Sequence, residues 1–246
     1  MTSADSQPHY PAIEPSVLRT ISSALMGRRR SFRADALALT AKLSPPLQVH
    51  GAEHIPPVGP YLVTANHYSR PGFPTAWIAL SISSVIEHEV TWVTVTEWVY
   101  PHQLRELFLR PSMRFVLTYI RKGYDFLAMP TMTPGYASPQ QRAEGVRKVM
   151  HAVKLNPSII LGLTPEGMDF PVGQLGTPPS GAGKFMLALN QMGLQILPAA
   201  VFERDGHLCL NFGTPYDLAL PPDILPSAVD AYVSNEVMAQ IAALFV

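Results

Sequence analysis

The run Tyr61-Leu62-Val63-Thr64-Ala65, followed directly by Asn66-His67, sets the architecture of this chain. Its residues are mostly apolar or β-branched and predict a buried strand. A second apolar run, Ser158-Ile159-Ile160-Leu161-Gly162-Leu163, ends in the turn Thr164-Pro165-Glu166-Gly167 and predicts another buried strand. Because sites in open α/β sheets collect at the carboxyl ends of the strands, we expect His67 and Glu166 to share one sheet edge.

Helical and strand patterns alternate along the rest of the chain. We expect further strands over 91–96, 195–201 and 207–212, the last two joined as a hairpin through Glu203-Arg204-Asp205-Gly206. We also expect helices over 75–85, 104–120, 183–192 and 226–246. Pro111 should interrupt the second of these helices. Ser138-Pro139-Gln140-Gln141 predicts another helix start with a capping box. The alternation predicts an α/β fold with a mixed, largely parallel central sheet covered by helices on both faces.

The N-terminal part differs in composition from the rest. Residues 1–12 are predicted to be disordered, and 14–43 show a helical apolar stripe that includes Arg28-Arg29-Arg30-Ser31-Phe32-Arg33. A basic amphipathic helix can lie in a lipid headgroup layer, or it can pack on the protein with its arginines in water. We therefore expect an N-terminal tail and amphipathic helical segment, 1–44, and one α/β domain, 45–246.

Composition excludes some classes of function and limits the location. The chain has 246 residues, 15% of them charged, and a formal net charge of zero, which argues against a nucleic-acid partner. The single cysteine, Cys209, lies in an apolar run and predicts a buried strand thiol in a reducing compartment. With neither a signal-peptide pattern nor a membrane-spanning run, we expect a cytoplasmic protein, peripheral on the inner membrane face if it meets lipid.

Four runs, in order, resemble the glycerolipid acyltransferase family, whose lysophosphatidate members move a fatty acyl group from a thioester to a hydroxyl. They are Val49–Pro60, Trp92–Glu97, Ile159–Gly167 and Gly183–Val201, within residues 47–202. The resemblance implies an O-acyltransferase with acyl-CoA or acyl carrier protein as co-substrate, no other cofactor, and a lipid-like alcohol as acceptor. It implies His67 as the general base and Glu166 as a site-organising residue.

The first motif departs from the family at its last position. The family pattern is His-x-x-x-x-Asp, and here the run is His67-Tyr68-Ser69-Arg70-Pro71-Gly72, so glycine replaces the carboxylate. Three outcomes are open. Another carboxylate, Glu166 or Asp169, orients His67; a backbone carbonyl does so less efficiently; or the protein binds without turnover.

The phosphate contacts of the family also change. The third motif commonly reads Pro-Glu-Gly-Thr-Arg, and here it is Pro165-Glu166-Gly167-Met168-Asp169, which exchanges a cation for a carboxylate. The second motif has lost its Arg, for which Arg121 is only a loose substitute. The remaining cations for a phosphate or for the nucleotide of coenzyme A are Arg70 and Lys184. Predicted substrate-binding residues are Asn66, Arg70, Pro165, Gly167 and Lys184.

Two further readings bear on function. Ser180-Gly181-Ala182-Gly183-Lys184-Phe185 is similar to a phosphate-binding loop, but it lacks the first glycine and the magnesium-binding hydroxyl. It predicts a turn into a helix whose N–H groups can favour an anion. No metal site is predicted. An acyltransferase is the first hypothesis, and a non-catalytic lipid or acyl-chain binding protein with the same fold is the alternative.

Overall fold

The computed structural model describes residues 7–96, 103–131, 136–168 and 174–245, with the backbone alone for 103–110. Contacts divide the chain into two compact units. The first unit comprises Met1–Pro11, Phe32–Val90 and Ser158–Val246, and the second comprises Ala12–Ser31 and Thr91–Pro157. Both predicted motif residues, His67 and Glu166, lie in the first unit.

Five strands form the sheet of the first unit, in the order β1-β7-β6-β2-β5. Their bounds are β1 Gln48–His50, β2 Tyr61–Ala65, β5 Ile160–Leu163, β6 Gln195–Arg204 and β7 His207–Phe212. Neighbours pair in parallel except β6 and β7, which form the predicted antiparallel hairpin. All five residues of β2 are buried, as its unbroken apolar run predicts. The predicted mixed, largely parallel sheet is confirmed.

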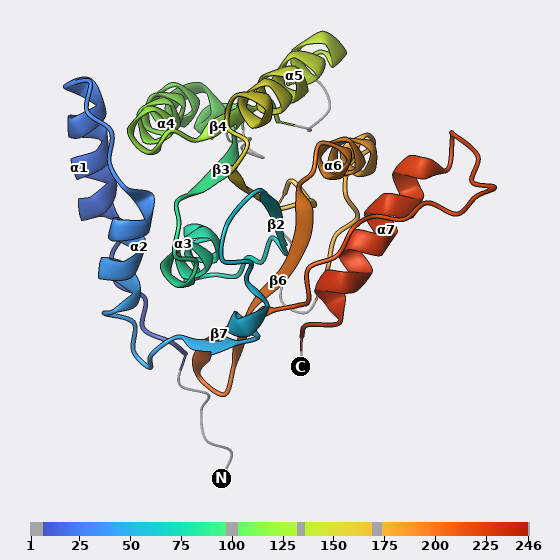
Figure 1. Cartoon of the computed structure of the whole chain (residues 1–246). Helices are drawn as coiled ribbons and strands as arrows, with labels where there is room; N and C mark the ends of the chain where they lie inside the picture. The colour runs from blue at the N-terminus through green and yellow to red at the C-terminus, as the bar shows by residue number, and fades with distance from the viewer. Residues whose placement is uncertain (1–6, 97–102, 132–135, 169–173, 246) are drawn as a thin grey trace. The chain divides into compact units, whose positions relative to one another are not determined.

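Helices cover both faces of this sheet. Figure 1 shows α2 (Phe32–Thr40) and α3 (Ala76–Val85) on one side of β2 and β6, and α6 (Ala182–Gln191) and α7 (Val229–Ala242) on the other. A short 3-10 helix, η1, spans Ala52–His54. Fully buried side chains from strands and helices meet in the core, among them Leu62, Trp77, Ile82, Leu161, Met186 and Ile196. The predicted covering of both faces is confirmed.

The second unit pairs strand β3 (Val90–Val95), whose first residue belongs to the first unit, in parallel with β4 (Leu127–Met129). Its helices are α1 (Glu14–Leu25), α4 (Gln103–Tyr124) and α5 (Pro139–Leu155). The predicted capping box at Ser138 is present, with the Gln141 N–H donating to the Ser138 hydroxyl at 3.2 Å. Helix α1 packs on α4, where the Thr20 hydroxyl donates to the Tyr124 hydroxyl at 2.7 Å.

Three expectations are corrected by the structure. Helix α4 continues through Pro111, where the residue is exposed and the helix lacks only the main-chain hydrogen bond that proline cannot donate. The helical stretch over 14–43 is two helices, separated by residues 26–31. Residues 8–11 are ordered rather than disordered, since His9 pairs with Ser44 and the Tyr10 ring packs on Trp77. Strands β1 and β4 are not expected from the sequence, because three residues are too few to show a strand pattern.

Candidate active site

His67 and Glu166 meet at one edge of the first unit's sheet. Strand β2 pairs in parallel with β5, with Thr64 opposite Leu163, so both chains leave the sheet at the same end. Just beyond, the Glu166 carboxylate accepts a hydrogen bond from the backbone N–H of His67. The predicted shared edge is confirmed. The His67 residue is partly exposed there, and its Nδ1 atom is buried.

The Glu166 side chain connects its own turn to the backbone at His67 and at Gly176. Its residue is 2% exposed, and its second oxygen accepts from the Gly176 N–H at 2.5 Å. Gly167 follows with φ +66°, and its N–H donates to the Thr164 carbonyl at 3.2 Å, closing the turn. Burial raises the pKa of Glu166, although hydrogen bonds from the Gly176 and His67 amides favour the ionised form. Glu166 contacts His67 through the main chain, and orientation of the imidazole by Glu166 stays a prediction.

Gly72 occupies a backbone conformation that suits glycine. The Phe73 N–H donates to the Arg70 carbonyl at 3.1 Å, and Gly72 has φ +83°. With Pro71 before it, this is the arrangement of a type II turn, whose third residue requires positive φ. The turn therefore explains why position 72 carries glycine and not the carboxylate of the family motif.

Gly72→Asp is expected to lower stability by about 1–2 kcal/mol and to give no gain in acyl transfer, because the left-handed conformation strains an L-residue. The measurement is thermal unfolding together with thiol release from acyl-CoA. Gly72→Asn is the matched variant, since Asn has the same shape and tolerates this conformation better. A Gly72→Asp protein that is as stable as the wild type and more active would contradict this account.

Asn66 serves the fold in the structure. It is 2% exposed, and its amide both donates to the Val201 carbonyl at 2.9 Å and accepts from the Val201 N–H at 2.8 Å. These two bonds extend the pairing of β2 with β6 by one residue beyond Ala65. Contact of Asn66 with a substrate stays a prediction, and the side chain would have to give up these bonds to make it.

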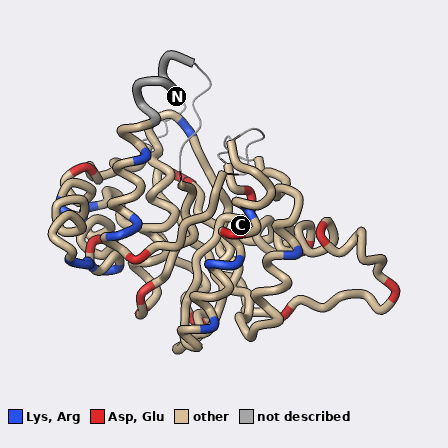
Figure 2. Tube along the Cα trace, turned by 90° about the horizontal axis from the view of Figure 1, so that it is seen from above, with Lys and Arg blue, Asp and Glu red and all other residues tan. Residues whose placement is uncertain are grey.

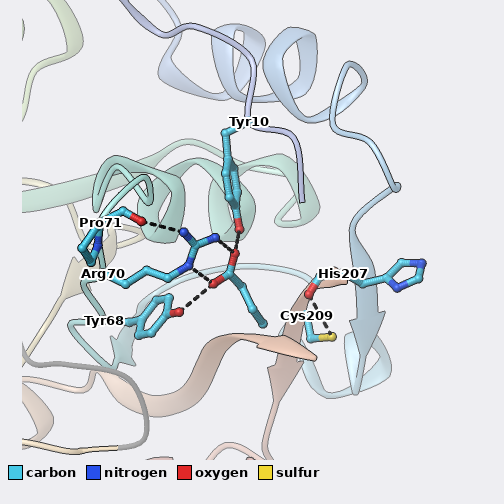
Figure 3. A network of polar contacts seen from close by, with 7 residues as sticks. Tyr10, Tyr68, Arg70, Pro71, His207 and Cys209 are labelled. Carbon is cyan, nitrogen blue, oxygen red and sulfur yellow. Dashed lines mark hydrogen bonds and ion pairs between the residues drawn. The ribbon is translucent and has the colours of Figure 1, made fainter. Parts of the chain in front are cut away.

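Arg70 is bound within the chain. Its guanidinium pairs with the Glu203 carboxylate (Figure 3), and both side chains are largely buried, with 11% and 13% of their surface exposed. A phosphate-binding role for Arg70 stays a prediction, and it would require a phosphate to displace or share this partner. The sequence pattern predicts Glu203 in the hairpin turn, but β6 runs through Arg204, so Glu203 is a strand residue whose role the pattern does not reveal.

Glu203 is held in its ionised form. Burial opposes the charge, but hydrogen bonds from Arg70, Tyr10 and Tyr68 outweigh it and hold the pKa of Glu203 below its usual value. Burial and the neighbouring carboxylate raise the pKa of both tyrosines, so they remain O–H donors. The cluster is therefore a stable carboxylate surrounded by donors.

The remaining candidates lie apart from these contacts. Asp230, on α7, accepts from the Gly181 N–H at 2.7 Å and the Lys184 N–H at 3.0 Å, so a carboxylate of this chain meets the N-terminus of α6. The Lys184 residue is exposed, and Pro165 is buried in its turn. Asp169 lies outside the described residues.

Two other residues considered from the sequence are bonded or buried within the fold. Arg121, in the second unit, donates to the Val95 carbonyl at 3.0 Å. Cys209 is a free, buried thiol in β7, and burial raises its pKa, which disfavours the nucleophilic thiolate. The prediction of a buried strand thiol is confirmed.

Comparison with known proteins places the chain in a family. Among curated proteins none matches it by sequence. The structure is similar to the 1-acyl-sn-glycerophosphate (LPA) acyltransferase PlsC from Thermotoga maritima, with 17% identity, TM-score 0.47, and coverage of 95% of this chain and 84% of that one. A sequence model of the family described as Acyltransferase matches residues 46–202, which is more than half of the chain. The chain therefore belongs to the acyltransferase family.

Proposed function

We propose that this acyltransferase moves a fatty acyl group from acyl-CoA or acyl carrier protein to the hydroxyl of a lipid-like alcohol of the glycerolipid or phospholipid class, with His67 as the general base. The observation that carries the proposal is the contact of His67 with the Pro165-Glu166-Gly167 turn at the carboxyl edge of the sheet. His67 and this turn belong to the first and third family motifs compared with the sequence above, and both lie within the residues that the family model matches.

In the proposed reaction, the His67 imidazole removes the proton of the acceptor hydroxyl as its oxygen attacks the thioester carbonyl. The tetrahedral intermediate collapses, the carbon–sulfur bond breaks, and the imidazolium returns the proton to the leaving thiolate. Glu166 supports the step by fixing the backbone on both sides of the site. The Gly167 N–H is used inside its own turn, so an oxyanion donor would come from neighbouring amides.

Helix α1 supports a peripheral membrane association. Its buried residues are the small polar Ser16 and Thr20, whereas Leu18 and Leu25 of the helix are 66% and 58% exposed and Met26, directly after it, is 63% exposed. Exposed apolar residues beside arginines suit a surface that enters the headgroup layer of anionic lipid. Lys and Arg are otherwise interspersed with Asp and Glu along the trace (Figure 2). No helix within the described ranges is long and apolar enough to cross a bilayer.

Replacing Leu25 and Met26 together by Gln is expected to weaken binding to anionic vesicles about tenfold, because their apolar area would no longer leave water. Wild-type binding should also weaken as salt rises. The measurement is vesicle co-sedimentation. Leu155→Gln is the control, since Leu155 is an equally exposed leucine on α5 of the same unit, at 72%. Equal binding by both variants and the wild type would contradict the membrane role of α1.

These two substitutions test the membrane role of α1 more specifically than a deletion of residues 1–44 would. Phe32, Ala36 and Leu39 of α2 are buried in the first unit, so a truncation would damage the core as well as α1. A loss of vesicle binding in the truncated protein could then come either from the absence of α1 or from damage to the core. The α1 variants leave the first unit intact and test the helix alone.

The experiment for the function is lipid mass spectrometry after incubation of the pure protein with acyl-CoA or acyl carrier protein donors. The acceptor panel pairs each lysolipid that carries a phosphate with a monoacylglycerol that does not. A new ester with at least one acceptor is the expected result. Acyl-chain binding with no product across the panel would favour the non-catalytic alternative, for which the exchange of Asp for Gly72 is the supporting observation.

A further inference from the structure

A buried carboxylate with several donors lies beside the loop that follows β2. We call residues 66–73 the His67 loop. Glu203, near the end of β6, accepts from Nε and Nη2 of Arg70 at 2.5 Å each, from the Tyr68 hydroxyl at 2.6 Å and from the Tyr10 hydroxyl at 2.6 Å. Figure 3 shows the three donor side chains converging on this one carboxylate. The proposed acyl transfer does not use Glu203 directly.

The cluster connects the His67 loop to the sheet. Tyr68 and Arg70 stand one and three residues after His67, so three of the four bonds come from the loop. Strand β6 pairs in register with β2, and β2 leads into the same loop. The Arg70 Nη1 also donates to the Pro71 carbonyl at 2.7 Å, inside the turn that contains Gly72. Bidentate and charge-assisted bonds fix orientation better than single neutral ones.

Tyr10 adds the N-terminal segment to the cluster. Its ring lies 5.3 Å from the Phe73 ring in an edge-to-face arrangement at 87° and 5.3 Å from the Trp77 ring. The His9 N–H donates to the Ser44 carbonyl at 2.7 Å, which anchors the segment beside Tyr10. Phe73 is also in contact with Tyr68, with ring centroids 4.7 Å apart. The end of the His67 loop thus packs against the Tyr10 ring, which also contacts Trp77 of α3.

We propose that Glu203 is a positioning residue of the active site, which holds the His67 loop through Arg70 and Tyr68, with Tyr10 as a latch from the N-terminal segment. In the family motif, a carboxylate at position 72 is inside the loop. Here position 72 is a glycine in a turn, and the carboxylate that restrains the loop belongs to Glu203, on β6. The inference rests on the proposed function, since it concerns how His67 is placed for catalysis.

A positioning role predicts a loss in kcat with little change in KM. A loop that places the base about 1 Å away can lose about 10²-fold in rate. We expect kcat to fall about 10²-fold in Glu203→Gln and about tenfold in Tyr68→Phe, with KM within about twofold of the wild type. Tyr10→Phe keeps the aromatic packing and removes one donor, and it should fall between the wild type and Tyr68→Phe.

The test combines these kinetics with hydrogen exchange of the amides of the His67 loop. Matched controls are Glu236→Gln and Tyr232→Phe, both on α7 and outside the cluster. In the positioning account, Glu203→Gln speeds exchange of the loop amides while those of β2 and β6 stay protected. Tyr68→Phe and Tyr10→Phe keep the ion pair, so they test the account even if Glu203→Gln fails to fold.

The outcomes separate this inference from the proposed function. Unchanged kcat and unchanged loop exchange in folded Glu203→Gln, or in both tyrosine variants if that protein does not fold, would overturn the positioning role. A change in KM alone would also overturn it, since it would place Glu203 in substrate binding. If the wild type releases no thiol with any acceptor, the proposed function fails, and hydrogen exchange alone then decides whether Glu203 holds the loop.

Discussion

His67→Ala is expected to reduce acyl transfer about 10³-fold, since a positioned general base contributes roughly 10²–10⁴-fold. The fold should survive, because the residue is partly exposed and the bond to Glu166 is made by the backbone N–H, which alanine retains. The measurement is thiol release from acyl-CoA at saturating acceptor, with circular dichroism to confirm folding.

The control for this substitution is His151→Ala, at an exposed position of α5. Its activity should equal that of the wild type. If His67→Ala turns over as fast as the wild type, His67 has no part in the mechanism, whatever the family motif implies. His67→Ala could lose activity because the base is missing or because the protein does not fold. The circular dichroism spectra distinguish these causes, since His151→Ala should be folded and active in both cases.

Glu166→Gln is expected to lower activity about 10²-fold by displacing the loop that carries the base and to destabilise the protein by about 2 kcal/mol by leaving a buried donor unpaired. The carboxylate accepts from two N–H groups, those of His67 and Gly176. A carboxamide offers one oxygen and turns an NH₂ group towards the other donor. The measurements are thermal unfolding and thiol release.

Glu236→Gln, in which the partly buried partner Gln240 is retained, controls for loss of a carboxylate elsewhere. Unchanged stability and activity in Glu166→Gln would show that the two backbone contacts have no consequence. Asp169→Asn separates the remaining alternative. A loss comparable to that of His67→Ala would assign orientation of the imidazole to Asp169, because members of one catalytic unit are strongly non-additive.

Much of the sheet could be predicted because its strands are buried on both faces. The runs over 61–65 and 158–163 contain no charged residue, which is the pattern of central parallel strands. Their shared carboxyl edge then brings His67 and Glu166 together, as the bond between them confirms. Local patterns of a few residues also predict structure in this chain, since the capping box expected at Ser138 is present.

The long-range polar contacts could not be predicted, since their partners are far apart in sequence. Arg70 and Glu203 are separated by 133 residues, and nothing near Glu203 distinguishes it from a turn residue. The contact of Asp230, on α7, with the N-terminus of α6 is a similar case, since Asp230 lies 49 residues from Gly181. The exchange of Asp for Gly72 was visible, but its cause, a turn with φ +83°, needed the backbone.

Acceptor-dependent thiol release by the wild type tests the central claim most directly, that this chain transfers acyl groups with glycine at position 72. Free thiol and new ester are measured in one reaction at saturating acyl-CoA, with and without the acceptor found by mass spectrometry. The account predicts one thiol for each ester formed and little release without acceptor. Thiol release that does not depend on acceptor, or none beyond that of His67→Ala, would contradict it.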